Sequence, residues 1–159
     1  MDKMFNVVLV HPQIPQNTGS IGRICVNTNS TLHIIKPIGF DLSEKAVRRA
    51  GLDYWKLLDL KVWESLEEFY EANKSYKERF FYSTTKSNTP YFQKEFKTGD
   101  FLFFGSETKG IPVEFMQKNW DNTMTIPMGK NGRSLNLSVS VGIVLYDAIR
   151  QNFDDFVSI

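Results

Sequence analysis

Short apolar runs alternate with helix-forming segments along the chain, and this alternation limits the fold more than any other feature. The apolar runs have the length of buried strands and lie at residues 5–11, 31–36, 79–85, 100–105 and 124–128. Helix signals fill the intervals, at residues 17–29, 43–51 and 65–73, from 112 onwards and from 134 onwards. This order predicts an α/β fold with a mainly parallel sheet and helices on both of its faces. With 159 residues, we expect one domain over residues 1–159.

Residues that satisfy free backbone groups set the expected helix ends. The stretch 17–19 is expected to cap the first helix, and Ser43 the second, which Gly51 closes. Ser65 and Glu68 have the spacing of a capping box, so a third helix should begin there.

The segment 132–142 gives two conflicting signals. Its apolar residues alternate with small polar ones as in a half-buried strand, yet residues 143–151 continue as a helix. We interpret the whole stretch as one helix from Ser134, because a strand leaves its second half unexplained. Ser134 and Asn136 then occupy the first turn, and the apolar remainder must be buried in the core or against another subunit.

Composition excludes several classes of protein. A net charge of +1 argues against a protein that coats nucleic acid by bulk charge, although local basic patches remain at 45–49, at Lys86 and at Lys109, Lys130 and Arg133. Cys25 is the single cysteine, so neither an intrachain disulfide nor a cysteine-based metal site is expected. The sequence shows neither a signal peptide nor a membrane span, which favours a cytoplasmic location and no membrane partner.

The two histidines also lack useful companions. His33 lies in a predicted strand and is expected to be packed rather than catalytic, and His11 has no neighbour that completes a triad or a zinc site. We therefore expect no metal.

Three predicted strands are followed by loops rich in small and basic residues. These loops read STTK at 83–86, GSETKG at 105–110 and PMGKNGRS at 127–134. Because parallel sheets bind ligands beyond the carboxyl ends of their strands, the loops are expected to converge on one pocket.

Two charged residues have open roles when read from the sequence alone. Glu107 could accept hydrogen bonds from a ligand or from backbone amides, or simply favour a helix N-terminus. Arg23 could be an ordinary surface arginine on an amphipathic helix, or a functional arginine on a largely buried helix, where it needs a partner.

Taken together, three stretches resemble the motifs of SpoU-type methyltransferases in the SPOUT superfamily. They are NTGSIGR at 17–23, GSETKG at 105–110, and IPM at 126–128 through SLN at 134–136. The whole chain resembles the small tRNA wobble-nucleotide 2′-O-methyltransferases of that family, as do LHIIKPIGF at 32–40 and RRAGLDYW at 48–55. The resemblance implies 2′-O-methylation of the wobble cytidine or modified uridine, and a C-terminal part tied in a deep trefoil knot.

The resemblance also implies a cofactor and its site. The methyl donor would be S-adenosyl-L-methionine, leaving S-adenosyl-L-homocysteine as product. The residues that match its binding site are Ser83, Thr84, Gly105, Glu107, Ile126, Met128, Ser134 and Leu135. Arg23 matches the favoured catalytic residue, as a base or as a phosphate clamp, and Asn17, Ser134 and Asn136 would hold the site.

The implied partners are a tRNA anticodon stem-loop and a second copy of the chain in a homodimer, without DNA. Candidates to touch RNA are Lys109, Lys130, Arg133 and Tyr146. The chain departs from the family at Lys109, where arginine is frequent, and at Asn29, where glycine is frequent. Three other interpretations stay open: the same chemistry on ribosomal RNA or another tRNA position, a catalytically silent RNA-binding knot protein, and a flavodoxin-like nucleotide or flavin binder.

Overall fold

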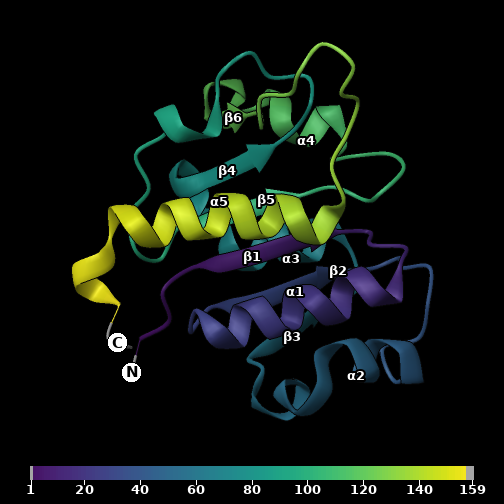
Figure 1. The fold of residues 1–159 in the computed structure, drawn as a ribbon. Coiled ribbons are helices and arrows are strands. Elements are labelled where there is room, and N and C mark those ends of the chain that lie inside the picture. Colours follow the sequence, from purple (N-terminus) through teal and green to yellow (C-terminus); the bar gives the residue numbers. More distant parts are fainter. Residues whose placement is uncertain (1, 157–159) are drawn as a thin grey trace.

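The computed structural model describes residues 2–156 and contains, within them, a sheet of six parallel strands (Figure 1). The strand order across the sheet is β3-β2-β1-β5-β4-β6. The strands are β1 (Asn6–Val10), β2 (Thr31–Ile35), β3 (Leu60–Trp63), β4 (Phe80–Ser83), β5 (Phe101–Phe104) and β6 (Thr123–Met124). All of their pairings are parallel, so the predicted α/β class is confirmed.

Helices cover both faces of this sheet, as predicted. The helices are α1 (Pro15–Asn27), α2 (Lys45–Gly51), α3 (Leu66–Asn73), α4 (Val113–Gln117) and α5 (Leu137–Gln151). Figure 1 shows α1 and α5 side by side on one face, with α2 packed against α1. Buried residues of α1 and α5 share one hydrophobic core, whereas α3 and α4 contribute to a second core on the opposite face.

Several element boundaries differ from the predictions. The first helix begins at Pro15, because proline lacks the N–H that a first turn leaves unpaired, and Asn17 therefore lies inside the helix. Ser43 does not cap α2: its amide and hydroxyl both donate to the carboxylate of Asp41. The capping role of Ser65 is confirmed, since its Oγ accepts the amide of Glu68 at 3.0 Å.

One strand was not predicted from the sequence, and the last helix begins later than predicted. Edge strand β3 was not predicted, because its two central residues are exposed and it shows no continuous apolar run. The helical interpretation of the last segment is confirmed, but α5 begins at Leu137 with Asn136 as its N-cap. Ser134 therefore lies in the preceding loop. Asn29 adopts a φ of 52°, a left-handed conformation that glycine adopts more readily than other residues.

His33 is packed, as predicted: it is 2% exposed, and its ring contacts Phe69 and Phe101 of the second core. Its Nδ1 accepts the indole N–H of Trp63 at 3.1 Å, so its Nε2 carries the proton and donates to Asn6 Oδ1 at 2.9 Å. Burial is the main cause that lowers the pKa of His33 to about 4. The ring is therefore neutral and joins β1, β2 and β3.

The long connection between β4 and β5 is bonded both to β6 and to the end of α5. The amide of Thr84 donates to Met124 O at 2.9 Å, and Thr125 exchanges backbone hydrogen bonds with Thr89 and Tyr91. Near the end of α5, Gln151 Oε1 accepts the amide of Phe96 at 2.8 Å. The segment that leaves β6 and returns as α5 is thus held against this connection at both of its ends.

Candidate active site

A cavity of about 340 Å³ opens beyond the carboxyl ends of β4, β5 and β6. Its walls come from the loops that follow these strands, so the predicted convergence of the three loops is confirmed. All residues that the family resemblance assigned to cofactor binding line it: Ser83, Thr84, Gly105, Glu107, Ile126, Met128, Ser134 and Leu135.

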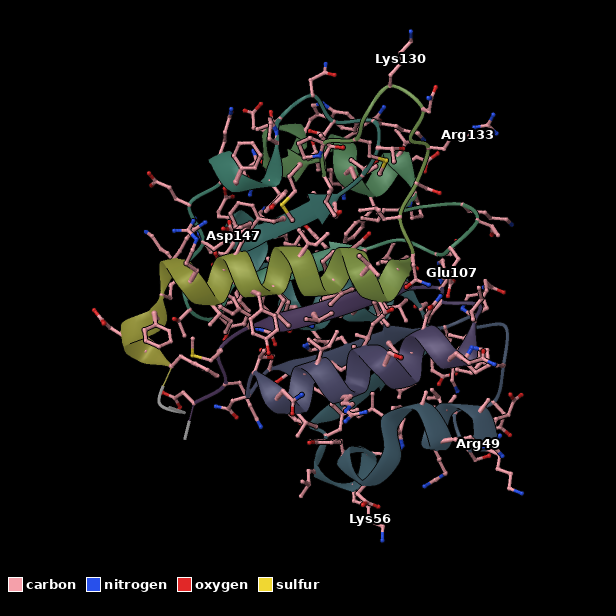
Figure 2. All side chains as sticks on the ribbon, viewed as in Figure 1. Arg49, Lys56, Glu107, Lys130, Arg133 and Asp147 are labelled. Atoms are coloured by element: carbon pink, nitrogen blue, oxygen red, sulfur yellow. The ribbon has the colours of Figure 1, made fainter. Side chains whose placement is uncertain are left out.

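The walls combine apolar, hydroxyl and cationic groups. The apolar part includes Phe104, Ile111 and Leu137. Cationic side chains at the cavity are Lys86, Lys109 and Arg133, and Figure 2 shows Arg133 and Lys130 projecting from the loop before α5. All three of Lys109, Lys130 and Arg133 were predicted as RNA contacts. Lys109 and Arg133 line the cavity, whereas Lys130 does not.

Gly105 allows the second loop to fold back closely on itself. A Cβ built on Gly105 would lie 2.1 Å from the carbonyl carbon of Gly110, which no side chain can tolerate. Ser106 closes the turn, because its Oγ accepts the amide of Lys109 at 2.9 Å and its carbonyl accepts the amide of Gly110. The backbone of this loop can therefore form a cavity wall without an intervening side chain.

The carboxylate of Glu107 is bonded to the start of α1. Its Oε1 accepts the amide of Gln13 at 2.8 Å, and its Oε2 accepts the amide of Ile14 and the Nδ2 of Asn17 at 3.0 and 3.1 Å. Figure 2 shows Glu107 near the first turns of α1 and α5. The carboxylate thus joins the loops after β1 and β5 and stabilises an N-terminus whose own cap residue, Ile14, has no side-chain acceptor.

Asn17 continues this network to the last helix. Its Oδ1 accepts the Nδ2 of Asn136 at 3.1 Å, while Asn136 Oδ1 caps α5 by accepting the amides of Ser138 and Val139. Glu107, Asn17 and Asn136 therefore link all three motif stretches through side-chain hydrogen bonds. Asn17 is buried, and neither asparagine lines the cavity, so both hold the surrounding loops rather than form its surface.

Arg23 and Tyr146 lie elsewhere on the surface. Arg23 is exposed, whereas Gly19, Gly22 and Cys25 are among the buried residues of α1. The guanidinium of Arg23 lies over the ring of Tyr54, and the exposed ring of Tyr146 projects from α5. Neither residue is among those that line the cavity.

Sequence reasoning missed some of the cavity lining. Thr85, Ser106, Thr108, Ile111 and Ser140 line the cavity without having been assigned to it. The first three lie in loops whose composition had already indicated a site, so that signal could have included them. Ser140 was hidden, because its position one turn into α5 depends on where that helix begins.

Cys25 does not serve as a nucleophile in this arrangement. Its side chain is completely buried in the first core, and burial raises the pKa of the thiol far above neutral. The thiolate form needed for nucleophilic attack is therefore suppressed.

Comparison with known proteins identifies the family of this chain. The model of the SpoU rRNA Methylase family matches residues 4–146, and the chain belongs to this family.

Among individual relatives, a Bacillus subtilis (strain 168) protein, named provisionally as a tRNA (cytidine(34)-2′-O)-methyltransferase, is 44% identical over 154 residues. The match covers 94% of this chain and 95% of that protein. A Burkholderia cenocepacia (strain HI2424) protein named tRNA (cytidine(34)-2′-O)-methyltransferase is 42% identical, with 93% and 96% covered. A solved structure described as giving insight into 2-OH methylation of C/U34 on tRNA has a TM-score of 0.88 at 38% identity and covers 96% of this chain and 98% of its own.

Within residues 2–156, none of the helices is both long enough and apolar enough to cross a membrane.

Proposed function

We propose that this chain methylates the ribose 2′-hydroxyl of the tRNA wobble nucleotide, cytidine or a modified uridine, with S-adenosyl-L-methionine as methyl donor. The observation that carries the proposal is the cavity in which every residue assigned to the cofactor meets. Family membership and relatives named for methylation of cytidine 34 support the reaction and its position.

The residues at the cavity fit an adenosyl cofactor. A volume of about 340 Å³ lies within the range of small-molecule sites, and its mixture of apolar side chains with hydroxyl and backbone groups suits a nucleoside. The close approach of Gly105 to Gly110 supplies a wall of backbone atoms. When bound, the cofactor supplies an electrophilic methyl group on a sulfonium, and loses it to become S-adenosyl-L-homocysteine.

The protein would contribute positioning and charge rather than covalent chemistry. The hydrogen bonds of Glu107, Asn17 and Asn136 fix the first turns of α1 and α5 beside the cavity. Ser134 and Leu135 would contact the cofactor from the loop before α5. A fixed geometry of this kind speeds displacement by aligning the attacking hydroxyl oxygen with the methyl carbon.

RNA contacts would come from exposed cations and one aromatic ring. Lys109 and Arg133 line the cavity, and Lys130 extends from the same loop as Arg133, as Figure 2 shows. Arg23 would bind an RNA phosphate, since a guanidinium has only N–H donors and its planar fork matches phosphate oxygens, which suits a clamp better than a base. Tyr146 offers a ring on which a base can stack.

We further infer a homodimer formed by the exposed side of α1 and α5. Ile14 and Val139 are 41% and 48% exposed, and exposed apolar side chains that gather into one patch mark an interface. Val139 and Ile143 lie one turn apart and form an apolar stripe in the first half of α5. A second copy of this chain would cover that stripe.

We also infer that the single domain over residues 1–159 ends in a trefoil knot. After β6 at the edge of the sheet, the chain returns as α5 and packs beside α1. The connection between β4 and β5 is hydrogen-bonded both to the β6 region and to the end of α5, and this supports a knot. In a knot, α5 would pass through the loop formed by that connection.

A labelling experiment tests the reaction and its position together. Purified protein would be incubated with methyl-labelled S-adenosyl-L-methionine and, in separate reactions, bulk tRNA or ribosomal RNA from cells that lack the gene. Because a 2′-O-methyl group blocks hydrolysis of the adjoining phosphodiester, label should appear in a nuclease-resistant dinucleotide from the anticodon loop. Label at another tRNA position, or only in ribosomal RNA, would retain the enzyme class and refute the substrate.

Absence of label from every RNA, with cofactor binding intact, would favour a silent RNA-binding protein. A visible absorption spectrum of the purified protein separates the remaining alternative, because a bound flavin absorbs there.

A further inference from the structure

The guanidinium of Arg23 is held over an aromatic ring rather than paired with a carboxylate. Its Cζ lies 5.0 Å from the ring centroid of Tyr54, which belongs to the 3-10 helix η1 (Leu52–Leu57). This distance is within the range of a cation–π contact. Within residues 2–156, Arg23 makes no ion pair, so the ring is the contact that orders its charged end.

A close contact one residue away keeps η1 against α1. A Cβ built on Gly22 would lie 2.9 Å from Cζ3 of Trp55 and 3.2 Å from Cδ2 of Leu58. The indole of Trp55 can therefore pack on α1 only because residue 22 has no side chain. Tyr54 and Trp55 are adjacent, as are Arg23 and Gly22, so the same packing places the tyrosine ring under the guanidinium.

An aromatic partner differs from a carboxylate partner in what it leaves free. Elsewhere in this chain, Asp100 accepts from Arg79 Nε at 2.8 Å and from Arg79 Nη2 at 2.6 Å, and Asp147 accepts from Arg150. Those carboxylates neutralise the cation and occupy its donors. The face of the Tyr54 ring restricts the rotamers of Arg23 while leaving its positive charge and its N–H donors for a phosphate.

We propose that Tyr54 is a positioning residue that holds the Arg23 guanidinium ready to bind an RNA phosphate. The proposal rests on the proposed function, in which Arg23 contacts the RNA. An unrestrained arginine loses rotamer entropy when it binds, so prior ordering by the ring raises affinity without adding a contact to the RNA. Nothing in this role requires the tyrosine hydroxyl.

The test compares two substitutions at residue 54 in two backgrounds. Tyr54→Leu removes the ring, and Tyr54→Phe keeps it; each is made in the wild-type chain and in Arg23→Ala. The measured quantities are the Kd for an unmodified tRNA transcript with cytidine at the wobble position and the initial rate of methyl transfer to it. Thermal unfolding and S-adenosyl-L-methionine binding establish that each variant is folded.

We expect Tyr54→Leu to weaken tRNA binding by about threefold to tenfold, which corresponds to the cost of immobilising one rotamer-rich side chain on binding. Tyr54→Phe should stay within about twofold of wild type, since its ring binds cations comparably. In the Arg23→Ala background, Tyr54→Leu should cause no further loss, because the two residues act as one unit.

The matched control is Tyr70→Leu. The ring of Tyr70 lies 5.0 Å from the ammonium of Lys118, a similar contact between α3 and the end of α4 on the other face of the sheet. This variant should bind tRNA like wild type.

Three results would overturn the inference. An equal loss from Tyr54→Leu with and without Arg23 would show that the ring has only a structural role. Unchanged affinity of Tyr54→Leu would show that ordering Arg23 does not matter. If wild type methylates tRNA and Arg23→Ala has the same affinity and rate, Arg23 is not part of the RNA interface. A wild-type protein that methylates no tRNA would instead refute the proposed function itself.

Discussion

Individual residues around the cavity differ in how directly they can touch a ligand. Glu107 lines the cavity, but both of its oxygens accept hydrogen bonds from the start of α1. The acidic residue of the second motif is thus explained by two backbone amides, Gln13 and Ile14, that would otherwise lack a side-chain partner. The sequence predicted that Glu107 lies at the cavity, but not which groups its carboxylate bonds, because those partners are about ninety residues away along the chain.

We predict that Glu107→Gln destabilises the first turn of α1. A glutamine amide would direct its own N–H groups at donors, so at least one of the bonds to Gln13, Ile14 and Asn17 is lost at a cost of about 0.5–1.5 kcal/mol. Hydrogen exchange at the amides of Gln13 and Ile14 should accelerate accordingly. Glu114→Gln is the control, since Glu114 is exposed in α4, and equal exchange rates in wild type and Glu107→Gln would contradict this role.

We predict that Gly105→Ala destroys the cavity wall. The added methyl group would overlap the backbone of Gly110 and Ile111, so the loop must open and cofactor affinity should fall at least tenfold. Isothermal titration with S-adenosyl-L-methionine measures the change. Gly129→Ala serves as control because its Cβ would meet nothing within 4 Å; similar losses in both variants would refute the explanation.

Among helices and strands, the predictions were confirmed where the apolar pattern of the sequence matches the burial of the residues in the folded chain. The apolar runs of β1, β2 and β5 form the centre of the sheet and are buried throughout or nearly so. Strand β3 escaped prediction because an edge strand needs no apolar run, and its central side chains face solvent. The start of α5 was placed at Ser134 because small polar residues suit a first turn, whereas Asn136 provides the actual cap.

We predict that His33 makes the central strands sensitive to acid. Its pKa is about 4 in the folded chain and about 6.5 when unfolded, so its contribution to stability is present above pH 6.5 and is lost as pH falls toward 4. Urea unfolding at pH 7.5 and 4.5 measures the loss, which should be about 2 kcal/mol smaller in His33→Gln than in wild type. The same loss in both proteins would show that carboxylates alone cause the acid sensitivity.

At the scale of the whole molecule, the sheet carries the loops to one edge, and the side-chain network then fixes them. The convergence of three loops followed from the order of strands and helices. The partnership of Glu107, Asn17 and Asn136 did not, because it depends on how α1 and α5 lie beside each other on one face, as Figure 1 shows. Arg23 was ambiguous for the same reason, since its exposure depends on which side of α1 faces the core.

We predict that the exposed stripe of α5 is covered in solution by a second copy of the chain. Val139→Lys would place a charge in that stripe, so sedimentation velocity should show a monomer where wild type is a dimer. Val62→Lys changes a comparably exposed valine on the edge strand β3 and should remain dimeric. A monomeric wild-type protein would contradict the proposed interface.

The proposed methylation involves one hydroxyl group on one nucleotide, and matched transcripts can test it. Two tRNA transcripts would be compared, identical except for cytidine or 2′-deoxycytidine at the wobble position, with mass spectrometry of the digested product as readout. We predict that a single methyl group appears on the ribose of the wobble cytidine and that the deoxy transcript gains none. Equal methylation of both transcripts would show that the methyl group goes to another atom and would refute wobble 2′-O-methylation.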